Sequence, residues 1–459
     1  MRVIICGAGQ VGYNIATYLM RDENDVTVID RNPEIIAQIN NHLDVQGVIG
    51  HASTPEVLSA AGAAEADMLI AVTSSDEVNM IACQVAHSLF NVPKKIARIR
   101  DSRYLDPAWA NLFSRAHMPI DAIILPEQEI ANSILDRLSV PGTTNVIPLC
   151  DGKLHLCAVI CEEDCPLVNT PLRQLRELFS DIRITAAAIN RKGVLTIPGP
   201  DDQMLVGDEV FLVIDTEQIN RALEGFGHEE KAARSIVIMG GGNVGLSLAK
   251  SIQDKFPAIS LKIIEHNHSR AITLSQELRD VIVLHGDGLD KAILEEADMR
   301  RTETLVAVTN DDEANILGSL LAREYGCDQT ITLLNKNTYN ALQTTLGLGA
   351  IVSPRAITAS RIMHFARRGR IKGVHGLLDG AAEIIEAELS EVSPIINKPL
   401  RDVQFPSDVR IAGVLRNGNE VLTPSPDFEL KADDRVVVVA LEGAARKVEK
   451  MFSVQVDLF

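Results

Sequence analysis

The sequence predicts an α/β protein made of two Rossmann-like domains with doubly wound parallel sheets, each followed by a small α+β domain. The first observation is a glycine turn, Gly7 to Gly12, which directly follows the apolar run Arg2 to Cys6 and returns at Gly240 to Gly245. The second is that short β-branched runs such as Val26 to Ile29 alternate with helical patterns such as Asn79 to Leu89. This alternation is typical of parallel βαβ units.

The chain is an internal duplication, which sets its domain organisation. The segment Ala71 to Asn79 returns as Ala307 to Asn315, and a second motif, Pro166 to Arg173, returns as Pro394 to Arg401. The second motif marks a smaller unit behind each Rossmann-like unit. A polar stretch, Gly225 to Arg234, separates the two halves. We therefore expect four domains over residues 1–122, 140–225, 234–352 and 373–457.

The smaller units have a different pattern from the larger ones. Strand-like runs at Val210 to Ile214 and Arg435 to Ala440 each follow Gly or Asp turn residues. This arrangement indicates compact α+β modules.

Both glycine turns have the context that a phosphate-binding turn requires. Each follows an apolar strand and opens a helical pattern, Val11 to Met20 in the first half and Val244 to Ile252 in the second. The first glycine allows a tight turn, the second lets a pyrophosphate approach the backbone, and the third packs the helix against the strand. Helix N–H groups would then face the phosphates. The alternative is that one or both turns serve packing alone, without a ligand.

A carboxylate at the end of the second strand is the next requirement, because it accepts hydrogen bonds from the adenine ribose hydroxyls. Asp30 ends the run Val26 to Ile29, and Glu265 ends the run Leu261 to Ile264. Each lies about 20 residues beyond the third glycine of its turn. A carboxylate here repels a 2′-phosphate, so the sequence favours NAD(H) or an adenine nucleotide over NADP(H), although the neighbouring Arg31 weakens this argument in the first half.

The strands that begin at Ala71 and Ala307 should end beside the glycine turns, at the edge where ligands bind such sheets. Polar side chains at these ends are placed to contact phosphate or ribose. They are Thr73 and Ser74 in the first half and Thr309 and Asn310 in the second. Arg98 ends the next strand and has the donors to bind a phosphate. Its counterpart region, Ile331 to Leu334, contains no arginine.

Other candidate sites have simpler interpretations. The acidic pairs Asp76-Glu77 and Asp312-Glu313, each followed by an asparagine (Asn79 or Asn315), fit helix capping and first-turn charge better than catalysis. His51 stands where the second half has Asp287, which argues against one shared proton-transfer role. His266 and His268 lack further ligands at metal-binding spacing, and Cys157 and Cys161 fall on one face of a strand, which favours packing.

Composition excludes several classes of protein. The formal net charge of −18 disfavours nucleic acid as a partner. No apolar stretch approaches the roughly 18 residues that span a bilayer. Seven cysteines, without an export signal, favour reduced thiols and a cytoplasmic protein.

The ordered motifs closely resemble the TrkA family, the regulatory subunits of bacterial Trk potassium-uptake systems, over essentially the whole chain. The resemblance rests on Ile4 to Gly12, Gly50-His51, Ala61-Gly62, Ala66 to Met68, Ala71 to Asn79 and Lys94 to Arg100. It implies tandem RCK (KTN) domains and peripheral binding to a membrane-embedded potassium transporter on the cytoplasmic side. It also implies regulation by NAD(H) or ATP/ADP and a homodimer or higher homo-oligomer.

The resemblance also implies specific nucleotide contacts. In the first half they would be Gly7, Ala8, Gly9, Gln10, Val11, Asp30, Thr73, Ser74 and Arg98. In the second half they would be Gly240, Gly241, Gly242, Asn243, Val244, Glu265, Asp287 and Thr309. Two departures from the family pattern are His51, where an acidic residue is usual, and the missing second arginine.

The sequence is also compatible with two other functions. The same fold hosts NAD-dependent oxidoreductases, but we find no set of histidine, lysine or tyrosine residues that recurs or converges by spacing. A scaffold with empty pockets is the third possibility. The sequence therefore favours a non-enzymatic, nucleotide-binding regulator.

Overall fold

The computed structural model describes the whole chain except residues 22–23, 180, 337–338, 340–345, 367–369 and 453–459. The chain forms two compact units. The first unit contains residues 1–126, 355–383 and 445–449, and the second contains the remainder. Each unit is described by itself.

The first unit contains a six-stranded parallel sheet with the order β3-β2-β1-β4-β5-β6. Its strands are β1 (Arg2–Cys6), β2 (Asp25–Asp30), β3 (Gln46–Ile49), β4 (Met68–Ala71), β5 (Lys94–Arg98) and β6 (Ala122–Ile124). Its helices are α1 (Gln10–Arg21), α2 (Pro33–His42), α3 (Pro55–Ala60) and α4 (Asp76–Phe90). Short 3₁₀ turns are η1 (Ala63–Glu65), η2 (Ser102–Leu105) and η3 (Pro107–Trp109).

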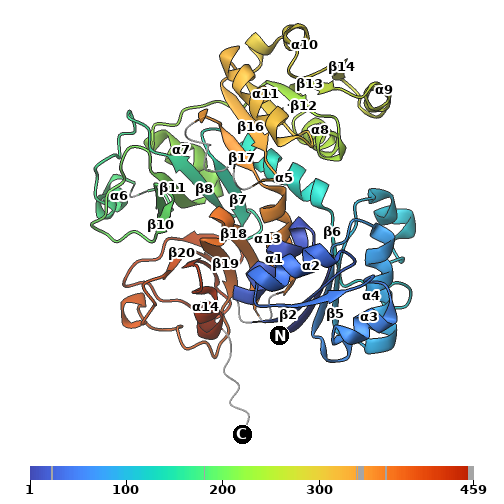
Figure 1. Cartoon of the computed structure of the whole chain (residues 1–459). Coiled ribbons are helices and arrows are strands. Elements are labelled where there is room, and N and C mark those ends of the chain that lie inside the picture. The colour runs from blue at the N-terminus through green and yellow to red at the C-terminus, as the bar shows by residue number, and fades with distance from the viewer. Residues whose placement is uncertain (22–23, 180, 337–338, 340–345, 367–369, 453–459) are drawn as a thin grey trace. The chain divides into compact units, whose positions relative to one another are not determined.

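Helices cover both faces of this sheet, as a doubly wound fold requires. On one face, Ile15 and Leu19 of α1 and Ile39 of α2 pack against alternate residues of β1 and β2. On the other face, Leu58 of α3 and Cys83 of α4 pack against the intervening residues. The labels of Figure 1 show α1 and α2 on one side of this sheet and α3 and α4 on the other. The continuous burial of β4 follows from this double cover.

The second unit repeats this architecture as a sheet with the order β14-β13-β12-β15-β16-β17. Its strands are β12 (Ser235–Met239), β13 (Ser260–Glu265), β14 (Val281–His285), β15 (Thr304–Ala307), β16 (Gln329–Leu333) and β17 (Ala350–Val352). Its helical segments are α8 (Asn243–Lys255), α9 (His268–Glu277), α10 (Lys291–Glu296), η5 (Met299–Arg301) and α11 (Asp312–Glu324). The predicted pair of Rossmann-like parallel sheets is confirmed.

Two small antiparallel sheets complete the fold. The first has the order β10-β9-β11-β8-β7. Its elements are β7 (Asn145–Leu149), β8 (Leu154–Ile160), α6 (Leu172–Leu178), β9 (Ile184–Arg191), β10 (Val194–Thr196), β11 (Glu209–Asp215), η4 (Thr216–Gln218) and α7 (Ile219–Gly225). Cys157 and Cys161 lie in its hydrophobic core, which confirms that they serve packing.

The second small sheet contains the order β19-β22-β20-β21. Its elements are β19 (Ala382–Glu388), η8 (Leu400–Asp402), β20 (Val409–Arg416), β21 (Glu420–Leu422) and β22 (Arg435–Leu441). Strand β18 (Ile371–Leu377) and turn η7 (Leu378–Gly380) precede it in sequence, and α14 (Ala445–Phe452) follows it. The predicted α+β modules are confirmed.

Each large domain is connected to the small domain that follows it by a helix. Helix α13 (Pro354–Ala366) follows the second Rossmann sheet, yet Ala359, Ile362 and Met363 lie in the core of the first. Helix α5 (Pro126–Ser139) follows the first sheet, and nearly all of it belongs to the second unit, which also contains the first small sheet.

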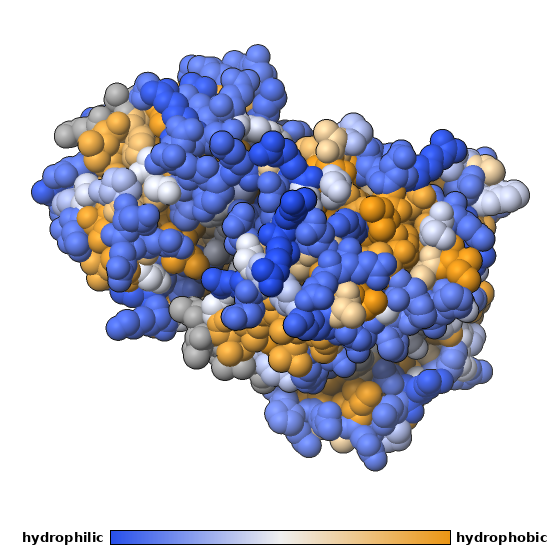
Figure 2. Space-filling model, turned by 90° about the horizontal axis from the view of Figure 1, so that it is seen from above, coloured by the Kyte–Doolittle hydropathy of each residue, from blue (hydrophilic) through white to orange (hydrophobic). Residues whose placement is uncertain are grey.

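None of the helices that the structure describes is both long and apolar enough to cross a bilayer. The face in Figure 2 is largely hydrophilic and carries separate hydrophobic patches.

Candidate nucleotide-binding sites

The first glycine of each turn has a backbone conformation and an environment that exclude a side chain. Gly7 has φ +109° and Gly240 has φ +108°, values that side chains rarely adopt. A Cβ at Gly7 would lie 3.0 Å from the backbone nitrogen of Thr73, and one at Gly240 would lie 2.9 Å from that of Thr309. Each turn therefore passes directly beside the end of β4 or β15.

The third glycine allows each helix to approach its strand closely. A Cβ at Gly12 would lie 1.8 Å from the Gly7 carbonyl oxygen, and one at Gly245 would lie 2.0 Å from that of Gly240. The turn and the helix start are thus locked together in both halves.

The middle glycine faces open space. A Cβ at Gly9 or Gly242 would meet no atom within 4 Å, and both residues are exposed. The next residues, Gln10 and Asn243, begin α1 and α8. Because the first N–H groups of a helix have no intrahelical partner, each turn offers several backbone donors to an anion.

The predicted acidic residues end β2 and β13 and hold the glycine turns. Asp30 Oδ2 accepts a hydrogen bond from Ala8 N–H at 2.8 Å, and its Oδ1 accepts one from Asn32 N–H at 2.9 Å. Glu265 repeats this with Gly241 N–H at 2.8 Å and Asn267 N–H at 2.7 Å. A carboxylate oxygen has more than one acceptor position, so these bonds leave room for ribose hydroxyls.

Two buried asparagines connect the ends of neighbouring strands. Asn79 Oδ1 accepts hydrogen bonds from the N–H and the hydroxyl of Thr73, and its Nδ2 donates to the Arg98 carbonyl at 2.9 Å. Asn315 repeats the pattern with Thr309 and the Leu333 carbonyl. While this bond is held, neither threonine hydroxyl has a hydrogen to donate to a ligand, and each also accepts from a backbone N–H, that of Ser75 or of Asp311.

Neither these asparagines nor the acidic pairs before them cap the two helices. The caps are Ser75, which accepts from Val78 N–H, and Asp311, which accepts from Ala314 N–H. Asn79 and Asn315 lie inside their helices and are fully buried. A threonine followed six residues later by asparagine, present in both halves, is the sequence signal that identifies them.

The acidic pairs at the helix starts have structural partners. Asp76 Oδ2 accepts from Arg100 N–H and Asp101 N–H, both at 2.9 Å. In the second half, hydrogen bonds from Lys336 and Tyr339 lower the pKa of Glu313 to about 2. Both pairs lie in the first helical turn, as expected.

The remaining predicted residues lie at the same sheet edges. Ser74 is exposed directly after Thr73, and Arg98 is the last residue of β5. Asp287 is exposed in the loop after β14, where its Oδ1 accepts from Leu289 N–H at 2.9 Å. His51, at the equivalent position, contacts the Ser53 hydroxyl through Nδ1 at 2.8 Å. His266 and His268 are exposed.

The two sites fit the adenosine diphosphate part of a nucleotide. Each combines an open glycine cradle, a helix start and a carboxylate that is fixed beside the turn. Among the described residues, no group of three or more His, Cys, Asp or Glu side chains is arranged to hold a metal ion.

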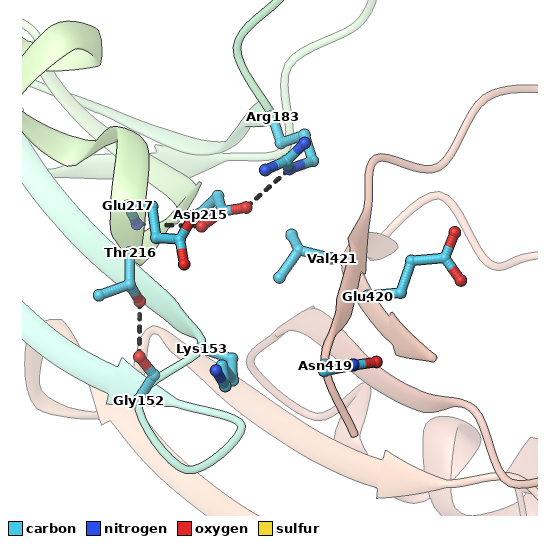
Figure 3. Close-up of a pocket in the computed structure, with 9 residues that line it drawn as sticks. All are labelled: Gly152, Lys153, Arg183, Asp215, Thr216, Glu217, Asn419, Glu420 and Val421. Carbon is cyan, nitrogen blue, oxygen red and sulfur yellow. Dashed lines mark hydrogen bonds and ion pairs between the residues drawn. The ribbon is translucent and has the colours of Figure 1, made fainter. Parts of the chain in front are cut away.

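A separate cavity lies in the second unit, and no residue of a glycine turn lines it (Figure 3). Lys153, Arg183 and Asp215 line it from the first small sheet, and the hairpin between β20 and β21 lines it from the second. Arg183 Nε pairs with Asp215 Oδ2 at 2.6 Å, and the Thr216 hydroxyl donates to the Gly152 carbonyl at 2.6 Å. No predicted site residue lines it.

Family models match both halves of the chain. The TrkA-N domain matches residues 3–126 and 236–354, and the TrkA-C domain matches residues 158–227 and 384–453. Among solved structures, the GsuK RCK domain has a TM-score of 0.59 at 17% identity and covers 98% of this chain and 94% of that one. The GsuK channel has a TM-score of 0.60 at 17% identity and covers 98% and 78%. These likenesses show a shared RCK fold.

Curated relatives match along the full length. The Trk system potassium uptake protein TrkA of Azorhizobium caulinodans is 47% identical and covers 100% of both chains. The protein of the same name from Halomonas elongata is 38% identical, again over 100% of both chains, and that of Vibrio alginolyticus is 37% identical over 95% of both. The chain therefore belongs to the TrkA family of Trk system potassium uptake proteins.

Proposed function

We propose that this chain is a cytoplasmic regulatory subunit that binds NAD(H) or ATP/ADP and thereby gates a membrane-embedded potassium-uptake transporter. The observation that carries the proposal is the pair of glycine cradles, each with an open middle glycine and a fixed carboxylate. The full-length relatives bear the name of a potassium uptake system, which supports the choice of partner.

Nucleotide binding is the first step of the proposal. The backbone donors at Gln10 and Val11 would hold a diphosphate, as would those at Asn243 and Val244. Asp30 and Glu265 would accept hydrogen bonds from the ribose hydroxyls. One solved structure that shares this fold is titled as the GsuK channel bound to NAD, which agrees with this class of ligand.

Gating follows if the ligand binds two arrangements of the chain with unequal affinity. Helix α13 follows the second Rossmann sheet in sequence and packs in the core of the first, so a change at one pocket would reach the other half. A coupling free energy of about 1–3 kcal/mol, typical of allostery, would change the open fraction of the transporter severalfold. A homodimer or higher oligomer on the cytoplasmic membrane surface would present several pockets to one transporter.

The experiment is potassium flux through the reconstituted transporter with added wild-type chain, Asp30→Ala or Glu265→Ala. We expect NADH, NAD, ATP or ADP to change flux with the wild-type chain. Each variant should need a higher concentration of the effective nucleotide, with NADP ineffective throughout. Flux that ignores every nucleotide, or variants with unchanged dose dependence, would contradict the proposal.

The competing assignment as an NAD-dependent oxidoreductase has a direct test. Steady consumption of NADH by the pure chain with a metabolite extract would support an enzyme. We expect none beyond the rate of the extract alone.

A further inference from the structure

Three differences between the two halves meet at one point of the second glycine turn. Gly241 stands where the first turn has Ala8, Glu265 stands where the first half has Asp30, and Arg270 in α9 stands where α2 has Ile35. A Cβ at Gly241 would lie 3.0 Å from Glu265 Oε2 and 2.2 Å from Leu274 Cδ1. Only glycine therefore leaves room at position 241 for the Glu265 side chain and for Leu274 of α9.

The Arg270 side chain extends from α9 to the second glycine turn. Its Nε donates to the Gly241 carbonyl at 2.7 Å, inside the turn that would hold a diphosphate. Its Nη2 is shielded from solvent and has no hydrogen-bond partner among the described residues. In the first half, Ile35 instead packs against the hydrophobic core.

The charge of Arg270 is not neutralised by an ion pair with any described residue. The nearby Glu277 pairs with Lys250 at 2.8 Å, and Glu265 accepts from backbone N–H groups. Lys336, which follows β16 at the same sheet edge, pairs with Glu313 at 2.8 Å. A guanidinium that keeps its charge beside a phosphate-binding turn attracts a phosphate strongly, because charge-assisted hydrogen bonds exceed neutral ones.

We propose that Arg270 is a nucleotide-binding residue of the second pocket and supplies the cation that Arg98 would supply in the first. This inference rests on the proposed nucleotide binding. The second pocket would then recognise an adenosine diphosphate group chiefly by the charge of its phosphates. Arg270 would contact them on the side of the turn where Glu265 binds the ribose. In the first half, Ile35 occupies the equivalent position on its helix.

The test uses the full chain with its first pocket blocked by Gly9→Glu. A Cβ at Gly9 meets no atom within 4 Å, and the carboxylate of a glutamate at this position would repel phosphates. In this background, Arg270→Ile, which restores the residue of the first half, is titrated calorimetrically with ADP, AMP and adenosine. Arg270→Lys keeps the charge, and Ile35→Arg is the matched control on the equivalent helix.

We expect Arg270→Ile to weaken ADP binding about 10-fold or more, since a hydrogen bond to a charged group contributes about 1.5–3 kcal/mol. AMP should lose less, adenosine should lose nothing, and Arg270→Lys should keep part of the affinity. High salt should reduce the difference for ADP. Equal losses for ADP and adenosine would show that Arg270 only supports the turn, and unchanged ADP binding would also overturn the inference.

The test separates this inference from the proposed function. If the Gly9→Glu chain binds no ADP while a Gly242→Glu chain does, the second pocket is not a nucleotide site and the inference fails alone. If a Gly9→Glu/Gly242→Glu chain still binds ADP as the wild type does, the cradles are not the sites and both fail.

Discussion

Asn79 Oδ1 accepts hydrogen bonds from both the backbone N–H of Thr73, at 2.8 Å, and its hydroxyl, at 2.7 Å. The same side chain donates to the Arg98 carbonyl, so one buried amide holds the ends of β4 and β5 together. The second half repeats this arrangement around Asn315. Three residues with proposed nucleotide contacts, Thr73, Ser74 and Arg98, lie at these two strand ends. Asn79 is therefore a positioning residue of the site.

Replacement of this amide should therefore disturb both stability and binding. Asn79→Ala removes the acceptor of the Thr73 N–H and a donor to the Arg98 carbonyl, which should lower the free energy of unfolding by about 2–3 kcal/mol. Thermal denaturation measures the loss, and hydrogen exchange at the Thr73 amide should accelerate. Gln84→Ala on the same helix, whose side chain donates only to Ser88, is the control and should change little. Equal behaviour of the two variants would contradict the role given to Asn79.

The glycines of the first turn should differ sharply in tolerance. Gly12→Ala places a Cβ 1.8 Å from the Gly7 carbonyl oxygen, so the turn must shift, at a cost of about 3 kcal/mol. Gly9→Ala meets nothing within 4 Å and should change stability by less than about 0.5 kcal/mol. Chemical denaturation of the two variants compares them. The turn geometry described above would be wrong if Gly9→Ala were the more destabilising change.

The loss of folding stability in acid should depend in part on the buried Asp208. Burial by itself raises the pKa of this carboxyl, but hydrogen bonds from Arg191 and from the Leu205 N–H outweigh that effect and hold the pKa below its usual value. A depressed folded-state pKa stabilises the fold above the unfolded pKa of about 4, and this contribution is lost as pH falls through the folded value.

Asp208→Asn removes that contribution. It should lower stability by about 2 kcal/mol at neutral pH and flatten the decline in melting temperature below about pH 4. Melting curves between neutral pH and the acid range test both expectations. Glu217→Gln, on the exposed turn after β11, is the control and should keep the wild-type acid profile. An unchanged acid profile in Asp208→Asn would refute the assignment.

Thiol chemistry should report the burial of the cysteines. All seven are unpaired and buried. Desolvation raises the pKa of Cys6 and of Cys157 to about 12, so little thiolate forms at neutral pH. A thiol reagent should titrate almost no groups in the native chain and all seven after denaturation. Fast reaction of thiols in the native chain would contradict the burial of the cysteines described here.

The glycine turns and the carboxylates were predictable from the sequence because local geometry demands them. Gly7 needs a positive φ, and Asp30 must end a strand beside the turn, so residue type and spacing carry the information. The role of Asn79 was not read correctly, since an asparagine near a helix start has several local uses and only the neighbouring strand selects one. The role of Arg270 was missed because an arginine on a helix is usually exposed, and only the contact with the Gly241 carbonyl places it at the turn.

The packing of α13 in the core of the first Rossmann sheet was not predictable either. It depends on contacts between residues far apart in sequence, such as Ile362 with the core around Ile15 and Leu19. An apolar helix face indicates that the helix is buried on that side, but it does not indicate which sheet the helix packs against. The cavity of Figure 3 has the same character, because its lining joins residues near 153 with residues near 420.

The most direct test of the account is the number of adenine nucleotides bound per chain, measured by calorimetry with ADP and NADH. We predict two for the wild-type chain, one for Gly9→Glu, one for Gly242→Glu and none for the double variant, with unchanged melting temperatures in the absence of nucleotide. Retention of both bound nucleotides by the double variant would contradict it.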